Sequence, residues 1–310
     1  MTVDIVIPTY KPTADFFLLI KKLKEQSMKV NKIIIMNTEE KYFEILTCGT
    51  RFLMHNRDLD IFHLSRKEFD HGKTRNMGAA RSDADFVVFM TQDAMPDSVN
   101  MIHNLVTPLI KDSSIAVSYA RQKAKPDSSA VEKITREFNY PPKSHIKSKK
   151  DLPRLGIKTY FCSNVCAAYN MEIFRELKGF ISHTIFNEDM IYAAKAIKAG
   201  YKIAYVAEAH VIHSHDYTVF QQFHRNFDLG ISQADHPEIF SGVSSKSEGK
   251  KLVRTTIRKL KQQELDNKIF PFILMCGSKY LGFLFGKHYK QLPERLVYKW
   301  SMNKMYWRQL

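Results

Sequence analysis

The stretch VDIVIPTY at residues 3–10 decides the fold class of this 310-residue chain. Residues 3–7 are a short apolar run, which predicts a buried strand, and the polar tripeptide Pro8, Thr9 and Tyr10 follows it directly. Apolar residues at helical spacing then predict a helix that begins at Thr13 or Asp15. A buried strand followed by an amphipathic helix is the repeating unit of an α/β sheet.

The same alternation continues along the chain. Further strands are predicted at residues 33–36, 59–64, 86–90, 115–119, 160–169 and 201–206, and helices at 73–81, 99–110, 187–199, 217–229 and 248–263. This order predicts right-handed βαβ units and a mostly parallel sheet covered by helices on both faces. Such sheets bind ligands beyond the carboxyl ends of their strands, so the polar residues that follow each strand are the candidates for a site. The polar, proline-containing segment 123–151 is predicted to be an irregular or partly helical excursion near that site.

The composition is that of a globular protein with a large core, since 44% of the residues are hydrophobic and 25% are charged. Four cysteines without a CxxC pair predict reduced thiols and a cytosolic setting. The first ten residues lack the basic start and the long apolar run of a signal peptide. Residues 269–286 are apolar, but Pro271, Gly277, Lys279 and Gly282 interrupt them, so we predict no membrane span.

Positive charge is concentrated towards the C-terminus. The net charge is +15, and residues 241–310 hold 15 Lys and Arg against 4 Asp and Glu. We therefore predict a ligand-binding domain at residues 1–240 and a basic, partly amphipathic helical extension at residues 241–310. Such an extension suits an anionic membrane surface, and the alternatives are an ordinary helical subdomain or a contact in a homo-oligomer. The charge also suggests a nucleic-acid-binding protein, but no zinc-finger, RNP or helix-turn-helix signature accompanies it.

Asp93, His213 and His215 are the candidate metal ligands. Asp93 follows the strand predicted at residues 86–90, so its carboxylate is expected at the ligand-binding edge, where it can hold Mg²⁺ or Mn²⁺ and, through the ion, a diphosphate. A role in a turn or helix cap is the alternative. His213 and His215 would share one face of an extended stretch, which suits metal binding, although solvated loop histidines have the same pattern.

Two further clusters suit an anionic or nucleotide ligand. Glu188 and Asp189 open a predicted helix, where acidic residues either complement the helix dipole or place a carboxylate as a general base. Asp70, Lys73 and Arg75 surround a glycine just before a helix whose first amides suit an anion. This segment is neither a Walker A motif nor a Rossmann glycine motif, so ATPase and dehydrogenase chemistry lose their main support.

The order of these clusters resembles the inverting family 2 glycosyltransferases, which have the A-type nucleotide-sugar fold. Along the chain stand PTY (8–10), RNMG (75–78), the Asp93 motif, Glu188-Asp189 and a basic-aromatic helix at 217–229, so the resemblance covers residues 1 to about 230. Within the family, FDHG (69–72), TQDAMP (91–96), the C-terminal KYLG, GK and LP patterns, and SMNKMYW (301–307) look like bacterial rhamnosyltransferases.

The resemblance implies a single Rossmann-like domain that performs one inverting displacement. L-rhamnose would move from dTDP-β-L-rhamnose to a lipid-linked or growing polysaccharide acceptor, at the cytoplasmic, inner face of the cell membrane. Asp189 would be the general base, Asp93 with His213 or His215 would hold Mg²⁺ or Mn²⁺, and Glu188 would bind the acceptor or support the base. The implied donor-binding residues are Pro8, Thr9, Tyr10, Asn37, Asp70, Lys73, Arg75, Asn76, Gln92 and Arg225.

Two positions depart from the family pattern. The usual Asp-x-Asp is Thr91-Gln92-Asp93 here, so one carboxylate is missing, and Asn37 replaces the usual acidic residue after the second strand. Asn37 can still hydrogen-bond a pyrimidine. A UDP- or GDP-hexose is the alternative donor. A catalytically inactive sugar-binding module and a nucleotidyltransferase are rival classes, although the glycine-rich N-terminal loop of the latter is absent from the sequence.

Overall fold

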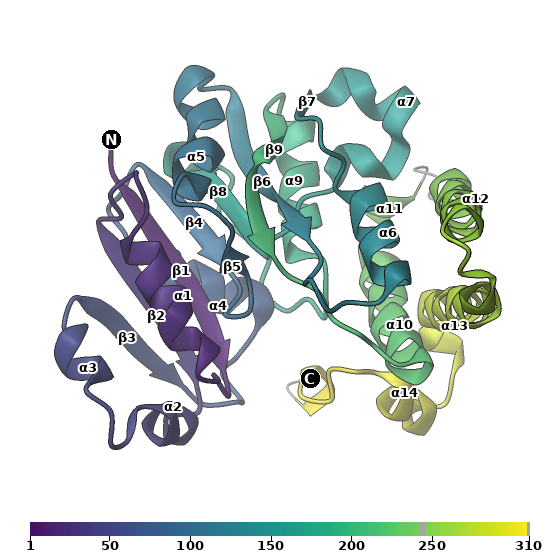
Figure 1. The fold of residues 1–310 in the computed structure, drawn as a ribbon, viewed down its shortest axis with the longest axis horizontal. Coiled ribbons are helices and arrows are strands. Elements are labelled where there is room, and N and C mark those ends of the chain that lie inside the picture. Colours follow the sequence, from purple (N-terminus) through teal and green to yellow (C-terminus); the bar gives the residue numbers. More distant parts are fainter. Residues whose placement is uncertain (242–245, 309–310) are drawn as a thin grey trace.

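A nine-stranded sheet is the centre of the part of the chain that the computed structural model describes, residues 1–241 and 246–308 (Figure 1). Its order is β3-β2-β1-β4-β8-β6-β9-β5, and β7 pairs with β9. The strands are β1 (Val3–Tyr10), β2 (Lys32–Thr38), β3 (Leu59–Leu64), β4 (Phe86–Met90), β5 (Met95–Pro96), β6 (Ile115–Lys123), β7 (His145–Lys147), β8 (Cys166–Asn170) and β9 (Lys202–Ile212).

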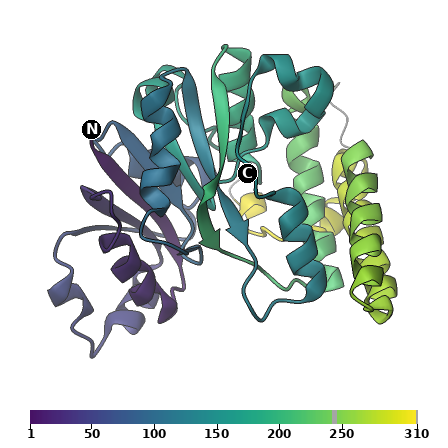
Figure 2. The same cartoon turned by 45° about the horizontal axis from the view of Figure 1, so that its top comes forward.

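Helices cover both faces of this sheet and form the C-terminal part (Figures 1 and 2). The α-helices are α1 (Asp15–Lys24), α2 (Glu40–Thr47), α3 (Phe52–His55), α4 (His71–Ala79), α5 (Met101–Lys111), α6 (Ala130–Asn139), α7 (Leu152–Leu155), α8 (Met171–Glu176), α9 (Glu188–Lys198), α10 (Val219–Asp235), α11 (Pro237–Phe240), α12 (Lys246–Gln262), α13 (Ile269–Lys287) and α14 (Glu294–Trp300). Short 3₁₀ turns are η1 (Lys149–Asp151), η2 (Gly156–Tyr160), η3 (Asp266–Lys268), η4 (Tyr289–Gln291) and η5 (Tyr306–Arg308).

The sheet is mostly parallel, as predicted. β3, β2, β1 and β4 pair in parallel, and so do β6 and β9. β8 is antiparallel to both of its neighbours, β4 and β6, so β6 has the same direction as β4. The carboxyl ends of β1, β2, β4 and β9 therefore meet at one edge, where the predicted site residues follow them.

Apolar residues on both faces of the strands explain the unbroken apolar runs. In β1, Val6 packs into the core layer on one face of the sheet, whereas Ile5 and Ile7 pack into the layer on the other face. Each of these side chains is fully buried. Period-two alternation combined with burial on both sides requires continuous hydrophobicity, which is the pattern that residues 3–7 display.

One prediction about elements is wrong. The strand predicted at residues 160–169 is only Cys166–Asn170, because the 3₁₀ turn η2 and a loop occupy the preceding residues. The segment 269–286, which belongs to the predicted helical extension, forms one continuous helix, α13, that includes Pro271 and its glycines. Pro271 is in the first helical turn, where the missing N–H has no intrahelical partner to lose. The segment predicted at 123–151 is partly helical, as expected, through α6.

The C-terminal extension has three parts. α12 packs against α6, and α13 packs along α10, so these two helices lie together at the edge of the molecule opposite β3 (Figures 1 and 2). Residues 301–308 then return towards the N-terminus of α4, where Met305 and Arg308 line a pocket with Asp70 and Lys73. The stretch Asp266–Lys287 is long and apolar enough to cross a membrane by length and composition, and only 17% of its most apolar window is buried.

Candidate active site

The carboxyl ends of β1 and β4 are joined by Gln92. Its side-chain Nε2 donates to the carbonyl of Tyr10 at 2.8 Å, and its Oε1 accepts from the amide of Tyr10 at 3.0 Å. These two hydrogen bonds resemble a pair of backbone hydrogen bonds between neighbouring strands, and they continue the pairing of β1 and β4 past the end of β4. Gln92 therefore sets the distance between the loop after β1, which begins with Pro8, Thr9 and Tyr10, and the loop that carries Asp93.

Asn37 is fully buried at the end of β2. Its Oδ1 accepts a hydrogen bond from the hydroxyl of Thr9 at 3.1 Å, and its Nδ2 lies 2.9 Å from Nδ1 of His63 on β3. The amide thus connects the ends of three adjacent strands. Each side-chain polar atom of Asn37 has a partner in the protein, so Thr9 and His63 hold the amide in one orientation.

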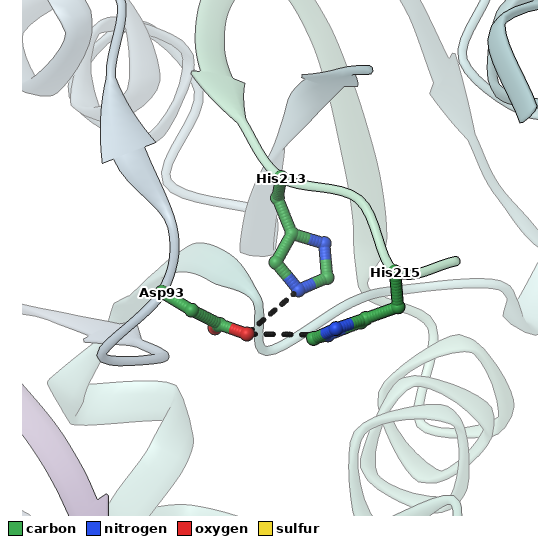
Figure 3. Close-up of side chains that lie close together, drawn as sticks. All are labelled: Asp93, His213 and His215. Atoms are coloured by element: carbon green, nitrogen blue, oxygen red, sulfur yellow. Dashed lines mark ion pairs between the residues drawn. The ribbon is translucent and has the colours of Figure 1, made fainter. Parts of the chain in front are cut away.

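Asp93, His213 and His215 come together as predicted (Figure 3). Oδ2 of Asp93 lies 3.5 Å from Nε2 of His213 and 3.1 Å from Nε2 of His215, and potential ligand atoms of all three lie within 4.8 Å of one another. Burial opposes ionisation of Asp93, but the hydrogen bonds from the two histidines outweigh it and hold the pKa of this carboxyl well below its usual range. One carboxylate and two imidazoles facing a common point form a set of ligands that suits a divalent cation.

A residue that sequence analysis missed, Gln122 on β6, orients His213. Its Oε1 lies 3.1 Å from Nδ1 of His213, and Nη1 of Arg136 donates to the same oxygen at 2.5 Å. Its Nε2 donates to the hydroxyls of Tyr140 and Ser163, at 2.6 and 2.9 Å. Because the Gln122 oxygen can only accept, His213 donates to it through Nδ1. Nε2 of His213 then donates to Asp93 when the ring is charged, and offers a lone pair to a bound cation when the ring is neutral. Burial lowers the pKa of His213, which favours the neutral ring.

Glu188 and Asp189 begin α9, and their environments differ sharply. Glu188 is buried and forms an ion pair with Nη1 of Arg75 at 3.2 Å, and Nδ2 of Asn164 donates to the same Glu188 oxygen at 3.2 Å. Although burial opposes it, the positive charge of Arg75 lowers the pKa of Glu188. Arg75, predicted to bind the donor, directs its guanidinium to Glu188 and to the carbonyl of His71.

Asp189 is partly buried and has no cationic partner within ion-pairing distance among the described residues. Backbone amides donate to its two oxygens, from Asn164 at 3.1 Å and from Met190 at 2.7 Å. Burial, and then the neighbouring Glu188 carboxylate, raise the pKa of Asp189 to about 7. Two adjacent carboxylates with opposite pKa shifts are the arrangement that separates a supporting acid from a general base. The preceding Asn187 has φ of 67°, in the left-handed region, which turns the chain sharply into this helix.

Three consecutive residues before β8 connect Asp189 to the group of Asp93, His213 and His215. Ser163 accepts from Gln122, which orients His213; Asn164 binds both Glu188 and Asp189; and the carbonyl of Val165 accepts from the amide of Thr91, two residues before Asp93. These contacts join the start of α9, the segment before β8 and the loop that carries Asp93 at one edge of the sheet. Sequence analysis assigned these residues to a strand. The polar pair Ser163-Asn164 inside an apolar stretch was the one sequence feature that could have indicated a role in the site.

The residues predicted on α4 are largely structural. Asp70 caps the helix, accepting from the amides of Lys73 at 2.7 Å and His183 at 3.2 Å. Asn76 pairs in both directions with the backbone of Phe180. Both residues thus fasten α4 to the loop that precedes Glu188. Lys73 itself is exposed.

Arg225 projects from α10 towards aromatic rings of the site. Its guanidinium carbon lies 4.6 Å from the ring centre of Phe186 and 5.7 Å from that of Tyr217, and Tyr217 in turn packs against the ring of His215 at 5.1 Å. No carboxylate lies within 4.0 Å of this guanidinium in the described part of the chain. Arg225 is therefore placed between the metal-ligand group and the segment before Glu188, with its charge available.

The fold and this site define the class of protein: the chain belongs to glycosyl transferase family 2, whose family model matches residues 4–178. It is 38% identical over 317 residues to the O-antigen chain rhamnosyltransferase RfbN of Salmonella typhimurium, covering 100% of this chain and 97% of RfbN. It is also 38% identical to the O-antigen chain rhamnosyltransferase WbaN of Salmonella anatum, covering 99% of this chain and 96% of WbaN.

Solved structures share the fold at low sequence identity. The mannosyltransferase PcManGT from Pyrobaculum calidifontis, in complex with GDP-Man and Mn²⁺, matches with a TM-score of 0.56 at 12% identity, covering 99% of this chain and 85% of that one. TarS 1-349 from S. aureus matches with a TM-score of 0.51 at 14% identity, covering 94% and 92%. These likenesses establish the architecture alone.

Proposed function

We propose that this protein transfers L-rhamnose, with inversion, from dTDP-β-L-rhamnose to a lipid-linked or growing O-antigen polysaccharide. The full-length similarity to two O-antigen rhamnosyltransferases supports the choice of sugar. The observation that carries the proposal is the connection of Asp189 to the Asp93 group through Ser163, Asn164 and Val165. These three residues connect a candidate base to a candidate ion site. A displacement at a nucleotide diphosphate sugar needs both groups, the base for the acceptor hydroxyl and the ion for the leaving diphosphate.

Asp93, His213 and His215 would hold a divalent cation, which when bound neutralises charge on the leaving diphosphate. The residues fit this role because both Nε2 atoms face one carboxylate oxygen and Gln122 fixes the protonation of the first histidine. Imidazole ligands suit transition metals, whereas Mg²⁺ prefers oxygen ligands. We therefore expect Mn²⁺ to support activity better than Mg²⁺ does.

Asp189 would accept the proton of the acceptor hydroxyl. A base with a pKa of about 7 is ionised in a large fraction of molecules at neutral pH and still binds a proton strongly enough to draw it from a reacting hydroxyl. Glu188 serves as its support: its negative charge raises the pKa of Asp189, and its pair with Arg75 keeps the start of α9 fixed on α4.

The donor would bind along the carboxyl ends of β1, β2 and β4. Gln92 fixes the loop after β1, Asn37 organises the ends of the strands, and Arg225 offers an uncompensated charge for phosphate. The proposed donor-binding set is Pro8, Thr9, Tyr10, Asn37, Asp70, Lys73, Arg75, Asn76, Gln92 and Arg225. In this set Asp70, Arg75 and Asn76 act by holding the backbone in place.

The extension would dock the enzyme on the cytoplasmic, inner face of the cell membrane, where a lipid-linked acceptor is found. One stripe of α13 exposes large apolar side chains: Phe270, Ile273, Leu274, Tyr280, Leu281, Leu284 and Phe285, from 37% to 76% exposed. The neighbouring α12 exposes the cations Lys250, Lys251, Arg254, Arg258 and Lys261. An exposed apolar stripe beside clustered positive charge suits an anionic bilayer surface.

Glycines hold α13 against the catalytic domain. A Cβ at Gly282 would lie 2.3 Å from the carbonyl oxygen of Phe223, and one at Gly286 would lie 2.1 Å from that of Phe227, both on α10. This close contact favours a helix that lies on the surface of the bilayer and stays packed on α10, over one that leaves α10 and spans.

Two experiments test these proposals. Purified protein, dTDP-β-L-rhamnose and Mn²⁺ are incubated with a lipid extract that contains the acceptor. We expect transfer by the wild type and its loss in Asp93→Asn, and no transfer by the wild type would refute the assignment.

Sedimentation with phosphatidylglycerol-containing vesicles tests whether the extension docks on a membrane. Phe270→Ser with Leu274→Ser should weaken binding more than about tenfold, because burying each side chain contributes about 1.5–3 kcal/mol. The matched control is Ile45→Ser, an exposed apolar residue on α2.

A further inference from the structure

A cavity of about 740 Å³ opens beside the N-terminus of α4, apart from the metal-ligand group. Its wall comes from three distant parts of the chain: the segment that includes Lys67 and Lys73, the loop that includes His183, and the C-terminal residues Met305 and Arg308. Pockets that bind small molecules have volumes of about 300–1,000 Å³. The cavity is therefore of the size of a substrate site, and the extension supplies part of it.

The charge in this cavity is dominated by cations. Lys67, Lys73 and Arg308 line it together with two acids, Glu68 and Asp70. Both acids accept hydrogen bonds from backbone amides: Asp70 from Lys73 and His183, and Glu68 from Ser65 at 2.8 Å. Within residues 1–241 and 246–308, no carboxylate oxygen lies within 4.0 Å of the ammonium of Lys73 or the guanidinium of Arg308. Lys73 and Arg308 can therefore pair with an anionic ligand.

A buried anchor holds the segment that carries Arg308. Asp228, on α10 and only 3% exposed, accepts from the amides of Met302 and Asn303, each at 2.9 Å. Further along, the ring of Tyr306 lies 6.3 Å from that of His183 on the cavity wall. Burying a carboxylate is costly unless it is hydrogen-bonded, so the pairing with Asp228 fixes where the C-terminal segment crosses the site.

We propose that this cavity is a second anion-binding subsite, which takes a phosphate-bearing part of a substrate and which Arg308 completes. The proposal rests on the proposed function, whose two substrates both carry phosphate: the nucleotide donor through its diphosphate and the acceptor through its lipid carrier. The C-terminal segment is then part of the substrate site, in addition to the membrane-docking helices α12 and α13. Guanidinium is well suited to this task because it binds phosphate in a bidentate manner.

The test removes one cation at a time: Arg308→Gln, Lys73→Gln and, as matched control, Arg295→Gln, an exposed cation of α14 that does not line the cavity. Affinity for dTDP with Mn²⁺ is measured by calorimetry, and the KM for the lipid extract by initial rates. If the subsite takes the donor, dTDP binds about tenfold more weakly to the first two variants; if it takes the acceptor, dTDP binding is unchanged and the KM for acceptor rises about tenfold. Arg308→Lys should recover part of either loss, which a merely structural defect would not allow.

Wild-type values of both quantities in Arg308→Gln and Lys73→Gln would overturn the proposal, and so would equal losses in Arg295→Gln. Inorganic diphosphate without metal separates this inference from the proposed function. If the wild type neither binds dTDP nor transfers sugar, the function is wrong. The subsite then stands if inorganic diphosphate binds the wild type and not Arg308→Gln, and it falls if both proteins bind equally.

Discussion

Activity should depend on pH through one ionisation, that of Asp189. The carboxylate must be ionised to accept the proton of the acceptor hydroxyl, so activity should rise as pH increases through its pKa of about 7. The structure gives the cause of this high value: Asp189 is largely shielded from water, and the carboxylate of Glu188 is its neighbour in the chain, whereas only two backbone amides favour its charge.

The magnitude follows from the ionised fraction. With a pKa of about 7, roughly one tenth of the molecules carry the charged base at pH 6 and roughly nine tenths at pH 8, so kcat/KM should rise about tenfold between them. Replacement by Asn removes the base and should lower kcat by about 10²- to 10⁴-fold. The small remaining rate of Asp189→Asn should no longer follow the same ionisation.

The assay measures initial rates of transfer from dTDP-β-L-rhamnose at saturating Mn²⁺ between pH 5.5 and pH 9, about 1.5 units below and 2 units above the expected midpoint. Circular dichroism at each pH verifies that the protein stays folded. A profile that is flat down to pH 5.5 in the wild type, or an acid limb that persists in Asp189→Asn, would refute the assignment of Asp189 as the base.

Three other perturbations test the supporting structure. Glu188→Gln leaves the buried guanidinium of Arg75 without its partner and should lower the free energy of unfolding by about 3–5 kcal/mol in denaturant titrations; an unchanged midpoint would show that the pair contributes little. Gly72→Ala would bring a Cβ to within 1.8 Å of a backbone carbonyl in the loop before α9, so we expect a loss of about 1–3 kcal/mol and slower transfer, and a variant with wild-type Tm and rate contradicts that packing. Gln122→Ala frees the ring of His213 and should raise the Mn²⁺ concentration for half-maximal activity about 10- to 100-fold, whereas an unchanged requirement would mean that Gln122 does not orient a ligand.

Much of the fold could be predicted because its signals are local. The apolar run of β1, buried on both faces, and the polar residues directly after β1 and β4 are patterns within ten residues of sequence. The same reasoning placed Asp93 at the ligand-binding edge and paired it with His213 and His215. Strand order, which brings β9 to the same edge as β4, completed that group.

What the sequence did not predict depends on contacts between distant segments. Gln122 orients a histidine 91 residues away, and Asn164 binds carboxylates 24 and 25 residues away. A single glutamine or asparagine has no periodicity or spacing that marks such a role. The pairing of Arg75 with Glu188 was not predicted for a related reason: the charge of Arg75 suggested phosphate, and only the fold brings Glu188, 113 positions along the chain, beside it.

The C-terminal part shows a second limit. Sequence analysis treated Pro271 only as an interruption of an apolar run, whereas the structure places it in the first turn of α13, where a helix tolerates it. The glycines of that run are packing positions, because Gly282 and Gly286 let the helix approach the backbone of α10. These glycines are needed because α10 packs against them, and the spacing of residues in the sequence does not show that α10 lies there.

The most direct measurement is the fate of the labelled sugar. Purified protein is given dTDP-β-L-rhamnose carrying a ¹⁴C-labelled sugar, Mn²⁺ and the lipid extract, and the label and anomeric configuration of the extracted lipid product are determined by scintillation counting and NMR. The account predicts an α-L-rhamnoside in the lipid fraction with wild type and none with Asp189→Asn. A β-linked product, or equal label with both proteins, would contradict an inverting transfer that uses the Asp189 carboxylate.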